Sequence, residues 1–175
     1  IIGHEDNIVL HHGRDRTDWE VELGVVIGRT ARYVPAAQAR NYVFGYTIHN
    51  DVSDRGGRPP GGFGQGSDWL VGKGAETYAP LGPWIVPAEF YADPTKELHM
   101  QLFIDGKLVQ EAKIEDMIHN VWELIEYASS IVTLHPGDVI NGGTTSGTSS
   151  GAFHAGTRSG YLKAGEVMEA KIKGI

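Results

Sequence analysis

Alternation of apolar and polar positions is the dominant pattern along this chain, and it predicts a structure built mainly from β-strands. Residues 19–27 alternate and then become apolar, as a strand does where it enters a core. Residues 42–50 and 166–172 alternate in the same way, and shorter apolar runs lie within residues 79–87 and 139–140. We expect a strand in each of these segments.

One hairpin and one helix stand out against this pattern. Asp105-Gly106 separates two apolar segments, residues 98–104 and 107–109, and an Asp-Gly pair in this position is a strong signal for a type I′ hairpin. Between residues 114 and 132, apolar side chains recur at the spacing of one helical face. This segment is the one long helix that we expect.

Glycine is the commonest residue, at 24 of 175, and mostly separates short apolar runs, which indicates many turns between strands. Residues 56–68 are rich in Gly and Pro and have no periodicity, so we expect a long loop, either a lid beside a site or an ordinary surface loop. The chain length predicts one domain, residues 1–175, of the α+β class with mainly β-structure and few helices.

Composition and charge exclude several classes of protein. The formal net charge of -7 and the absence of a Lys/Arg run disfavour nucleic-acid binding, and the apolar runs are too short for a membrane span. The absence of cysteine excludes disulfides and cysteine-ligated zinc, and it fits a reducing compartment, so we expect a cytoplasmic protein. The chain begins at Ile1 without a visible targeting signal, and we expect that an N-terminal segment is missing.

Two glutamates one residue apart are the first candidate for chemistry. If their segment is a strand, Glu20 and Glu22 point to the same face, and two adjacent carboxylates raise each other's pKa unless a cation neutralises them. Asp51, at the end of the next predicted strand, would add a third oxygen ligand if the two strands pair. Such a set suits Mg²⁺ or Mn²⁺. The alternative is that both glutamates lie on a solvated strand face.

Five motifs occur in a fixed order along the chain. They are TDWEVELGVVIG at 17–28, GYTIHNDVSDR at 45–55, GKG at 72–74 followed by PLGPW, DMIHN at 116–120 and LHPGDVI at 134–140. Together they are similar to the motifs of the fumarylacetoacetate hydrolase family, and the similarity covers essentially the whole chain. The resemblance implies a mixed β-roll, or pseudo-barrel, catalytic domain that forms a homodimer and acts on 2-oxo acids and β-diketo acids with one Mg²⁺ or Mn²⁺.

The resemblance also implies roles for particular residues. The family's metal-binding carboxylates fall on Glu20, Glu22 and Asp51. Its active-site lysine falls on Lys73, where an ammonium group stabilises a developing enolate or binds a carboxylate. The His and Glu that act as acid and base in hydrolytic and decarboxylating members belong to a short lid helix, which falls upstream of Ile1.

Four further residues match substrate-contacting positions of the family. Arg55 follows the metal Asp and serves either a substrate carboxylate or a structural ion pair. Arg58 stands where many members have Gln. Gly143 and Thr144 match a segment whose hydroxyl and amides contact the substrate carboxylate; otherwise this segment is a Gly-rich turn.

The eight histidines carry no assignment of their own. His49 shares a strand face with Asp51, so it is either an outer support of the metal site or a packed structural residue. His11 and His12 either border the site or lie in a surface loop, and His119 is expected to be partly buried or at an interface.

The predicted reaction is metal-dependent hydrolysis of a carbon–carbon bond in an acylpyruvate or β-diketo acid, of the fumarylacetoacetate or fumarylpyruvate type. Isomerisation or decarboxylation of a 2-oxo diacid on the same metal-enolate platform is one alternative, since these reactions diverge only after the enolate has formed. A catalytically silent metal-binding scaffold is the other.

Overall fold

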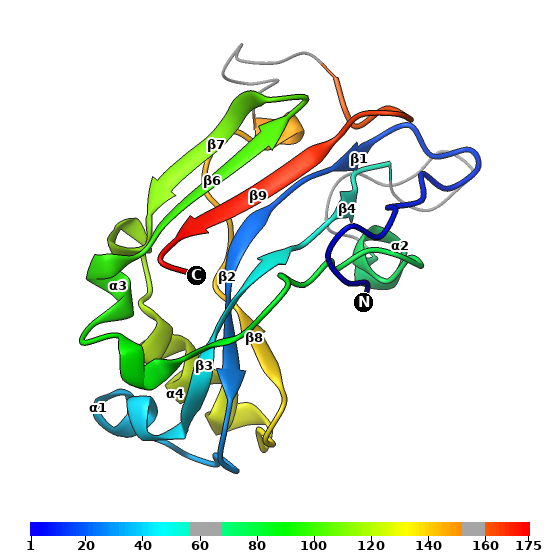
Figure 1. The fold of residues 1–175 in the computed structure, drawn as a ribbon. Helices are drawn as coiled ribbons and strands as arrows, with labels where there is room; N and C mark the ends of the chain where they lie inside the picture. The colour runs from blue at the N-terminus through cyan, green and yellow to red at the C-terminus, as the bar shows by residue number, and fades with distance from the viewer. Residues whose placement is uncertain (57–67, 152–159) are drawn as a thin grey trace.

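Three antiparallel sheets and a few short helices make up the part of the chain that the structure describes (Figure 1). The structure is a computed structural model, and it describes residues 1–56, 68–151 and 160–175. The strands are β1 (Thr17–Asp18), β2 (Val21–Ile27), β3 (Val43–Asn50), β4 (Ser53–Asp54), β5 (Val86–Pro87), β6 (His99–Ile104), β7 (Lys107–Lys113), β8 (Val139–Asn141) and β9 (Met168–Lys173). The α-helices are α1 (Ala36–Ala39), α2 (Trp69–Lys73), α3 (Pro94–Glu97) and α4 (Val121–Ile131), with 3₁₀ turns at Arg40–Tyr42, Ala88–Phe90 and Ile114–Asp116.

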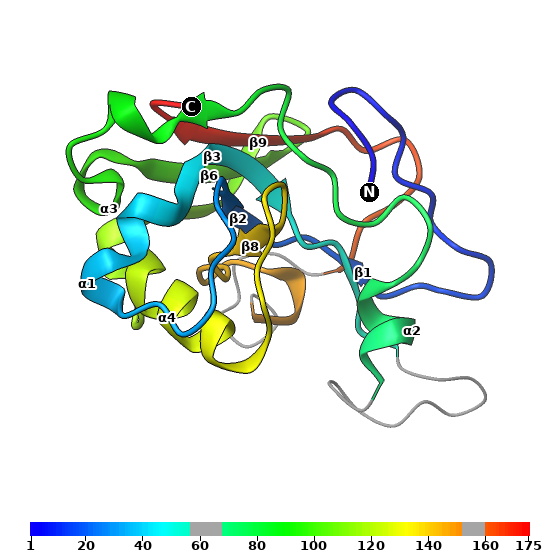
Figure 2. The ribbon, with the colours of Figure 1, turned by 90° about the horizontal axis from the view of Figure 1, so that it is seen from below.

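The sheets have the strand orders β5-β3-β2-β8, β7-β6-β9 and β1-β4. The predicted fold class, mainly β with few helices, is therefore confirmed. The described strands form open sheets, so the roll does not close into a barrel. Helices α1 and α4 lie side by side at one end of the molecule, whereas α2 lies apart from them next to β4 (Figures 1 and 2). None of the helices in the described ranges has both the length and the apolar character to cross a membrane.

The core forms where the four-stranded and three-stranded sheets face each other. On β2, every second side chain from Val21 to Ile27 is at most 1% exposed, and on β6 the same alternation buries Met100, Leu102 and Ile104. Burying each of these side chains contributes about 1.5–3 kcal/mol. The alternation in the sequence agrees with this packing, because strands present alternate residues to opposite faces.

The strand predicted at 19–27 begins only at Val21 in the structure, as β2, and β1 precedes it at Thr17–Asp18 in a different sheet. β1 pairs with β4, whereas β2 pairs with β3, so the chain passes from one sheet to another at Trp19 and Glu20. The change of partner strand interrupts the ladder there, and no pattern in residues 19–27 signals it. Glu20 consequently lies at the junction of two sheets and not inside a strand.

The hairpin prediction is confirmed and the helix prediction is partly wrong. Asp105 and Gly106 both have positive φ, at 48° and 75°, as a type I′ turn requires. Helix α4 begins only at Val121, because Asn120 caps it by accepting hydrogen bonds from the backbone N–H groups of Trp122 and Glu123. Residues 114–116 form a separate 3₁₀ turn, and the predicted apolar position Ile118 is 94% exposed.

Candidate metal centre

The three predicted metal carboxylates meet at the end of the β2–β3 ladder. Glu22 lies opposite His49 in the ladder, and the pairing continues beyond β3, where the backbone N–H of Asp51 donates to the carbonyl of Glu20 at 2.9 Å. Antiparallel pairing therefore places Asp51 across from Glu20. One carboxylate oxygen from each of Glu20, Glu22 and Asp51 lies within 4.8 Å of the others.

Glu22 is the most buried of the three carboxylates. It is only 3% exposed, and burial raises the pKa of its carboxyl group to about 7. The backbone N–H of Gly143 donates to Glu22 Oε2 at 2.9 Å and opposes this shift, while the nearby charges of Asp51 and Glu20 increase it. A cation at this position would stabilise the charged form that burial disfavours.

Lys73, at the C-terminal end of α2, holds two of the carboxylates. Its Nζ donates to Glu20 Oε2 at 2.9 Å and also to Asp51 Oδ2. Burial works against the ammonium charge, but the hydrogen bonds and negative charges of Asp51 and Glu20 outweigh it, so the pKa of Lys73 is raised. The helix that carries Lys73 is capped by Asp68, which accepts from Val71 N. Lys73 is thus a protonated group in contact with the carboxylates.

Arg55 binds the second carboxylate oxygen of Glu20. Its Nη2 donates to Glu20 Oε1, and its Nε donates to Asp18 Oδ2 at 3.2 Å. In the structure Arg55 thus forms ion pairs with Asp18 and Glu20. When all three are deprotonated, Glu20, Glu22 and Asp51 carry three negative charges against the two positive charges of Lys73 and Arg55, and Asp18 shares the charge of Arg55. The remaining negative charge and the all-oxygen donor set fit a divalent cation such as Mg²⁺ or Mn²⁺.

Gly143 and Thr144 lie beside Glu22, but their polar groups are engaged within the protein. The Gly143 N–H is bonded to Glu22, and Thr144 Oγ1 donates to the carbonyl of Val21 at 2.9 Å. Gln110 Nε2 in turn donates to Thr144 Oγ1 at 2.9 Å. In this structure the segment contacts the Glu22 carboxylate through Gly143 and the backbone of Val21 through Thr144. Arg58 and most of the predicted loop at 56–68 fall outside the described residues.

Two amide side chains that sequence reasoning missed hold the backbone around Glu20. Asn50 Oδ1 accepts from Glu20 N at 2.9 Å, and Gln110 Oε1 accepts from Val21 N at 3.0 Å. Both amides are at most 4% exposed. They replace the ladder bonds that are lost where the chain changes sheets. No local pattern distinguishes them from ordinary polar strand residues, because their partners are 30 and 89 positions away.

The histidines take different places. His49 is 3% exposed, and burial lowers its pKa against the opposing effect of Asp51; its Nδ1 has no hydrogen-bond partner among the described residues. His11 packs edge-on against Tyr78 in an irregular segment, and His12 is exposed. His119, predicted to be partly buried or at an interface, instead projects outward with a side chain that is 73% exposed, because it precedes the start of α4.

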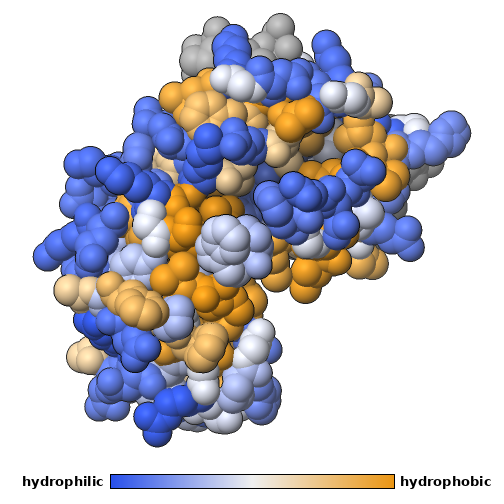
Figure 3. Space-filling view, viewed as in Figure 1, coloured by the Kyte–Doolittle hydropathy of each residue, from blue (hydrophilic) through white to orange (hydrophobic). Residues whose placement is uncertain are grey.

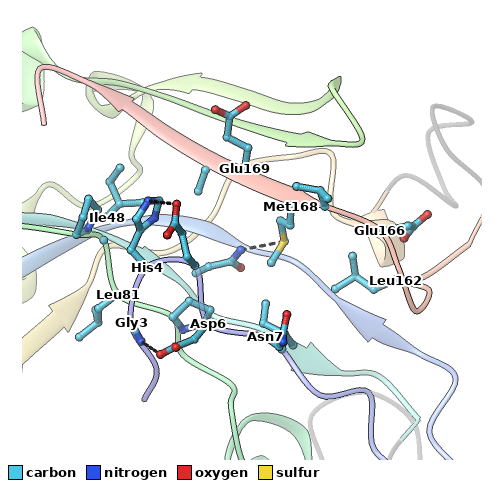
Figure 4. Close-up of a pocket in the computed structure, with 18 of the residues that line it drawn as sticks. Gly3, His4, Asp6, Asn7, Ile48, Leu81, Leu162, Glu166, Met168 and Glu169 are labelled. Carbon is cyan, nitrogen blue, oxygen red and sulfur yellow. Dashed lines mark hydrogen bonds and ion pairs between the residues drawn. The ribbon is translucent and has the colours of Figure 1, made fainter.

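A pocket of about 810 Å³ lies on the other side of β3 (Figure 4). Ile48, Leu81 and Met168 form part of its apolar wall, and Asp6 and Glu169 lie at its polar side. Figure 3 shows hydrophobic side chains gathered in the middle of this face of the molecule. None of the three clustered carboxylates lines this pocket. The carboxylates differ from this pocket in that an oxygen ligand set and two cations meet there.

Comparison with known proteins identifies the family. The family model described as "Fumarylacetoacetate (FAA) hydrolase C-terminal" matches residues 1–175. The chain belongs to the fumarylacetoacetate hydrolase family. Among curated relatives in this family, it is 42% identical over 171 residues to 2,4-didehydro-3-deoxy-L-rhamnonate hydrolase of Sphingomonas sp. (strain SKA58), covering 98% of this chain and 57% of that protein.

Solved structures of the fumarylacetoacetate hydrolase fold are also similar. A 5-carboxymethyl-2-hydroxymuconate delta-isomerase from Mycobacterium smegmatis matches with a TM-score of 0.82 and 33% identity, over 99% of this chain and 61% of that one. Fumarylpyruvate hydrolase from Pseudomonas aeruginosa, in complex with Mn²⁺ and pyruvate, matches with a TM-score of 0.78 and 28% identity, over 95% and 65%. The chain thus spans less than two thirds of the length of these relatives.

Proposed function

We propose that this chain is the catalytic domain of a divalent-metal-dependent enzyme that hydrolyses a carbon–carbon bond in an acylpyruvate or related β-diketo acid. The observation that carries the proposal is the convergence of Glu20, Glu22 and Asp51 within 4.8 Å, next to Lys73. Membership of the fumarylacetoacetate hydrolase family supports it. So does the fumarylpyruvate hydrolase structure, which holds Mn²⁺ and pyruvate together.

In this proposal Glu20, Glu22 and Asp51 hold one Mg²⁺ or Mn²⁺ ion. When bound, the ion supplies Lewis acidity toward the oxygens of a 2-oxo acid and a fixed point that orients them. The protein's own contribution is to fix the three ligands. Arg55 and Lys73 each hold one oxygen of Glu20, and the Gly143 N–H holds Glu22.

Lys73 is the residue that we assign to the reacting part of the substrate. Hydrolysis adds water to the distal carbonyl carbon and breaks the bond between that carbon and the adjacent methylene, which leaves a carboxylic acid and the enolate of pyruvate; the enolate then takes up a proton. A protonated amine beside the site stabilises the negative charge that develops on the enolate. Lys73 is held in that protonated state by Glu20 and Asp51.

The name of the Sphingomonas relative supports the substrate class. It places the two dehydro positions at carbons 2 and 4 of a sugar acid, which is the 1,3 relation between carbonyl groups that a β-diketo acid has. Isomerisation of an unsaturated 2-oxo diacid is a second candidate. It is favoured by the similarity to the isomerase from M. smegmatis. The two reactions share enolate formation and differ in whether water then breaks the carbon–carbon bond.

A substrate assay on the full-length protein tests the proposal. Fumarylpyruvate, maleylpyruvate and a 2,4-dioxo sugar acid are incubated with Mn²⁺ or with chelator, and products are identified by mass spectrometry. We expect Mn²⁺-dependent release of pyruvate, lost in Glu22→Gln and retained in the matched control Glu89→Gln, whose glutamate is exposed on a 3₁₀ turn and is not one of the three clustered carboxylates. Conversion without cleavage would favour the isomerase. Turnover by Glu22→Gln equal to that of the wild type would refute the metal-site assignment.

The predicted homodimer is part of the same proposal. Light scattering on the full-length protein measures its mass directly, and a monomer at micromolar concentration would contradict this part alone.

A further inference from the structure

Asp18 is a buried carboxylate that is connected to the candidate metal ligand Glu20 through Arg55. It ends β1 and is 0% exposed. Its Oδ1 accepts from Trp19 N at 2.9 Å and Ser149 N at 2.6 Å, and its Oδ2 accepts from Ser150 N at 3.0 Å and Arg55 Nε at 3.2 Å. A buried charge is costly unless it is paired and hydrogen-bonded, and four N–H donors meet this requirement.

The guanidinium of Arg55 transmits the position of Asp18 to a metal ligand. Its Nε is fixed by Asp18 and its Nη2 by Glu20 Oε1. Because the guanidinium is planar and rigid, fixing one nitrogen sets the direction of the others. Glu20 Oε2 is bonded to Lys73, so both oxygens of this ligand are oriented by cations, and one of these cations is anchored at Asp18.

A second set of contacts ties Asp18 to the segment that supports Glu22. The amides of Ser149 and Ser150 belong to the stretch that begins with Gly143, whose N–H holds Glu22. The neighbouring Trp19 also donates from its indole Nε1 to the carbonyl of Gly147 at 3.0 Å. One short segment, Asp18 and Trp19, therefore contacts both the cation beside Glu20 and the loop beside Glu22.

We infer that Asp18 is a positioning residue for the metal centre, acting mainly through Arg55 on Glu20. The inference rests on the proposed role of Glu20, Glu22 and Asp51 as metal ligands. With Asp18 present, the charge of Arg55 is shared between two carboxylates. Without it, Arg55 binds Glu20 alone and competes more strongly with a metal ion for that ligand.

The test is Mn²⁺ affinity, measured by calorimetry on the full-length protein and its Asp18→Asn variant. Asparagine keeps the shape but removes the charge and presents an amide N–H₂ to N–H donors. We expect the affinity to fall by about 10–100-fold, the usual effect of losing a partner that orients a metal ligand. The electron paramagnetic resonance spectrum of bound Mn²⁺ is expected to change as well, which a loss of fold stability alone would not cause.

Asp54→Asn is the matched control. Asp54 lies in β4, paired with β1, is also buried, and forms an ion pair with Arg14 at 3.3 Å; it is not one of the three clustered metal carboxylates. We expect this variant to be less stable but to bind Mn²⁺ with unchanged affinity. An equal loss of affinity in both variants would show that any buried charge in this region has the same effect, and it would overturn the inference.

Arg55→Lys provides a test that does not depend on the folding of Asp18→Asn. Lysine keeps the positive charge but lacks the fork that reaches Asp18 and Glu20 together, so we expect a similar loss of affinity. In the Arg55→Lys background, Asp18→Asn should add clearly less than it does alone. If the two substitutions lowered the Mn²⁺ affinity additively, Asp18 would not act through Arg55, and the inference would be overturned.

A wild-type protein that binds no Mn²⁺ would refute the proposed function itself, whereas wild-type binding with unchanged Asp18→Asn affinity would refute only this inference.

Discussion

The two faces of the segment that includes β2 belong to different environments, although the residues alternate along one stretch of chain. Val21, Leu23 and Val25 face the apolar core between two sheets, where each is at most 1% exposed. Glu20 and Glu22 face an ionic cluster whose partners are charged groups and backbone amides. The first face stabilises the fold by removing apolar area from water. The second has a net negative charge that opposes folding until a cation binds.

Because the two faces alternate along the chain, neighbouring residues are expected to affect different properties, the stability of the fold on one face and metal binding on the other. Core residues are expected to change the free energy of unfolding and leave metal affinity alone. A neutral substitution of Glu22 is expected to change metal affinity and to have a smaller or even favourable effect on the stability of the metal-free protein, because burial disfavours its charged form. Substitutions on each face test the two halves of this comparison.

The largest stability effect is expected for Leu23→Ala. It leaves a cavity among buried side chains, and such truncations cost about 2–5 kcal/mol. Mn²⁺ affinity measured well below the melting temperature should stay at the wild-type value. Denaturant unfolding gives the first quantity and calorimetry the second. Leu108→Ala is the control, because Leu108 is 41% exposed and its truncation should cost much less. If Leu23→Ala weakened Mn²⁺ binding as strongly as it weakens the fold, the two faces would not be separable.

A pH effect of intermediate size is expected from Glu22. Its folded-state pKa of about 7 lies above the ordinary value of 4.5, so the folded metal-free protein binds a proton that the unfolded chain releases. Stability of the metal-free protein should therefore fall as pH rises from about 4.5 to 7, as far as this group contributes. Urea unfolding in the presence of chelator measures the change, and Glu22→Gln should abolish this contribution.

Metal binding reverses the sign of this pH dependence. Since the ion requires the deprotonated carboxylate, Mn²⁺ affinity should fall as pH drops below about 7, with release of a proton on binding. Calorimetry in buffers of different ionisation enthalpy counts that proton. Binding that releases none at a pH about one unit lower would contradict the raised pKa of Glu22.

The smallest effect is expected for Asn120→Ala, at the start of α4. The change removes the side-chain cap of α4, which costs about 1 kcal/mol. Thermal unfolding should register the loss, whereas Mn²⁺ affinity should not change. Ser130→Ala is a control within the same helix, since its hydroxyl bonds only to the preceding turn at Tyr127 among the interactions that the structure describes. A cap variant as stable as the control would show that α4 is held by packing alone.

The errors in prediction have physical causes that these regions illustrate. The predicted helix starts too early, because apolar residues already recur at helical spacing before Asn120. The capping residues Asn120 and Glu123 define where α4 begins. The strand predicted at 19–27 starts at Val21 instead. Residue alternation reports which face is buried and not which neighbouring strand supplies the hydrogen bonds, so it does not locate the point where the chain changes sheets. Gln110 and Asn50 were missed for a related reason, since a buried amide is recognised only when its distant partner is known.

The sequence by itself determined the fold class, the buried face of β2, the type I′ turn, the family and the carboxylates that come together. These follow from local periodicity and from motifs that keep their order along the chain. Only the tertiary structure decided that Lys73 and Arg55 hold Glu20, and that Asp18 lies behind Arg55. Those contacts join residues 35 to 53 positions apart, and the contact between Gly143 and Glu22 spans 121. The pairing of strands that are far apart in the sequence and the packing of separate sheets set these contacts, and no pattern within one segment reports which distant segment will lie beside it.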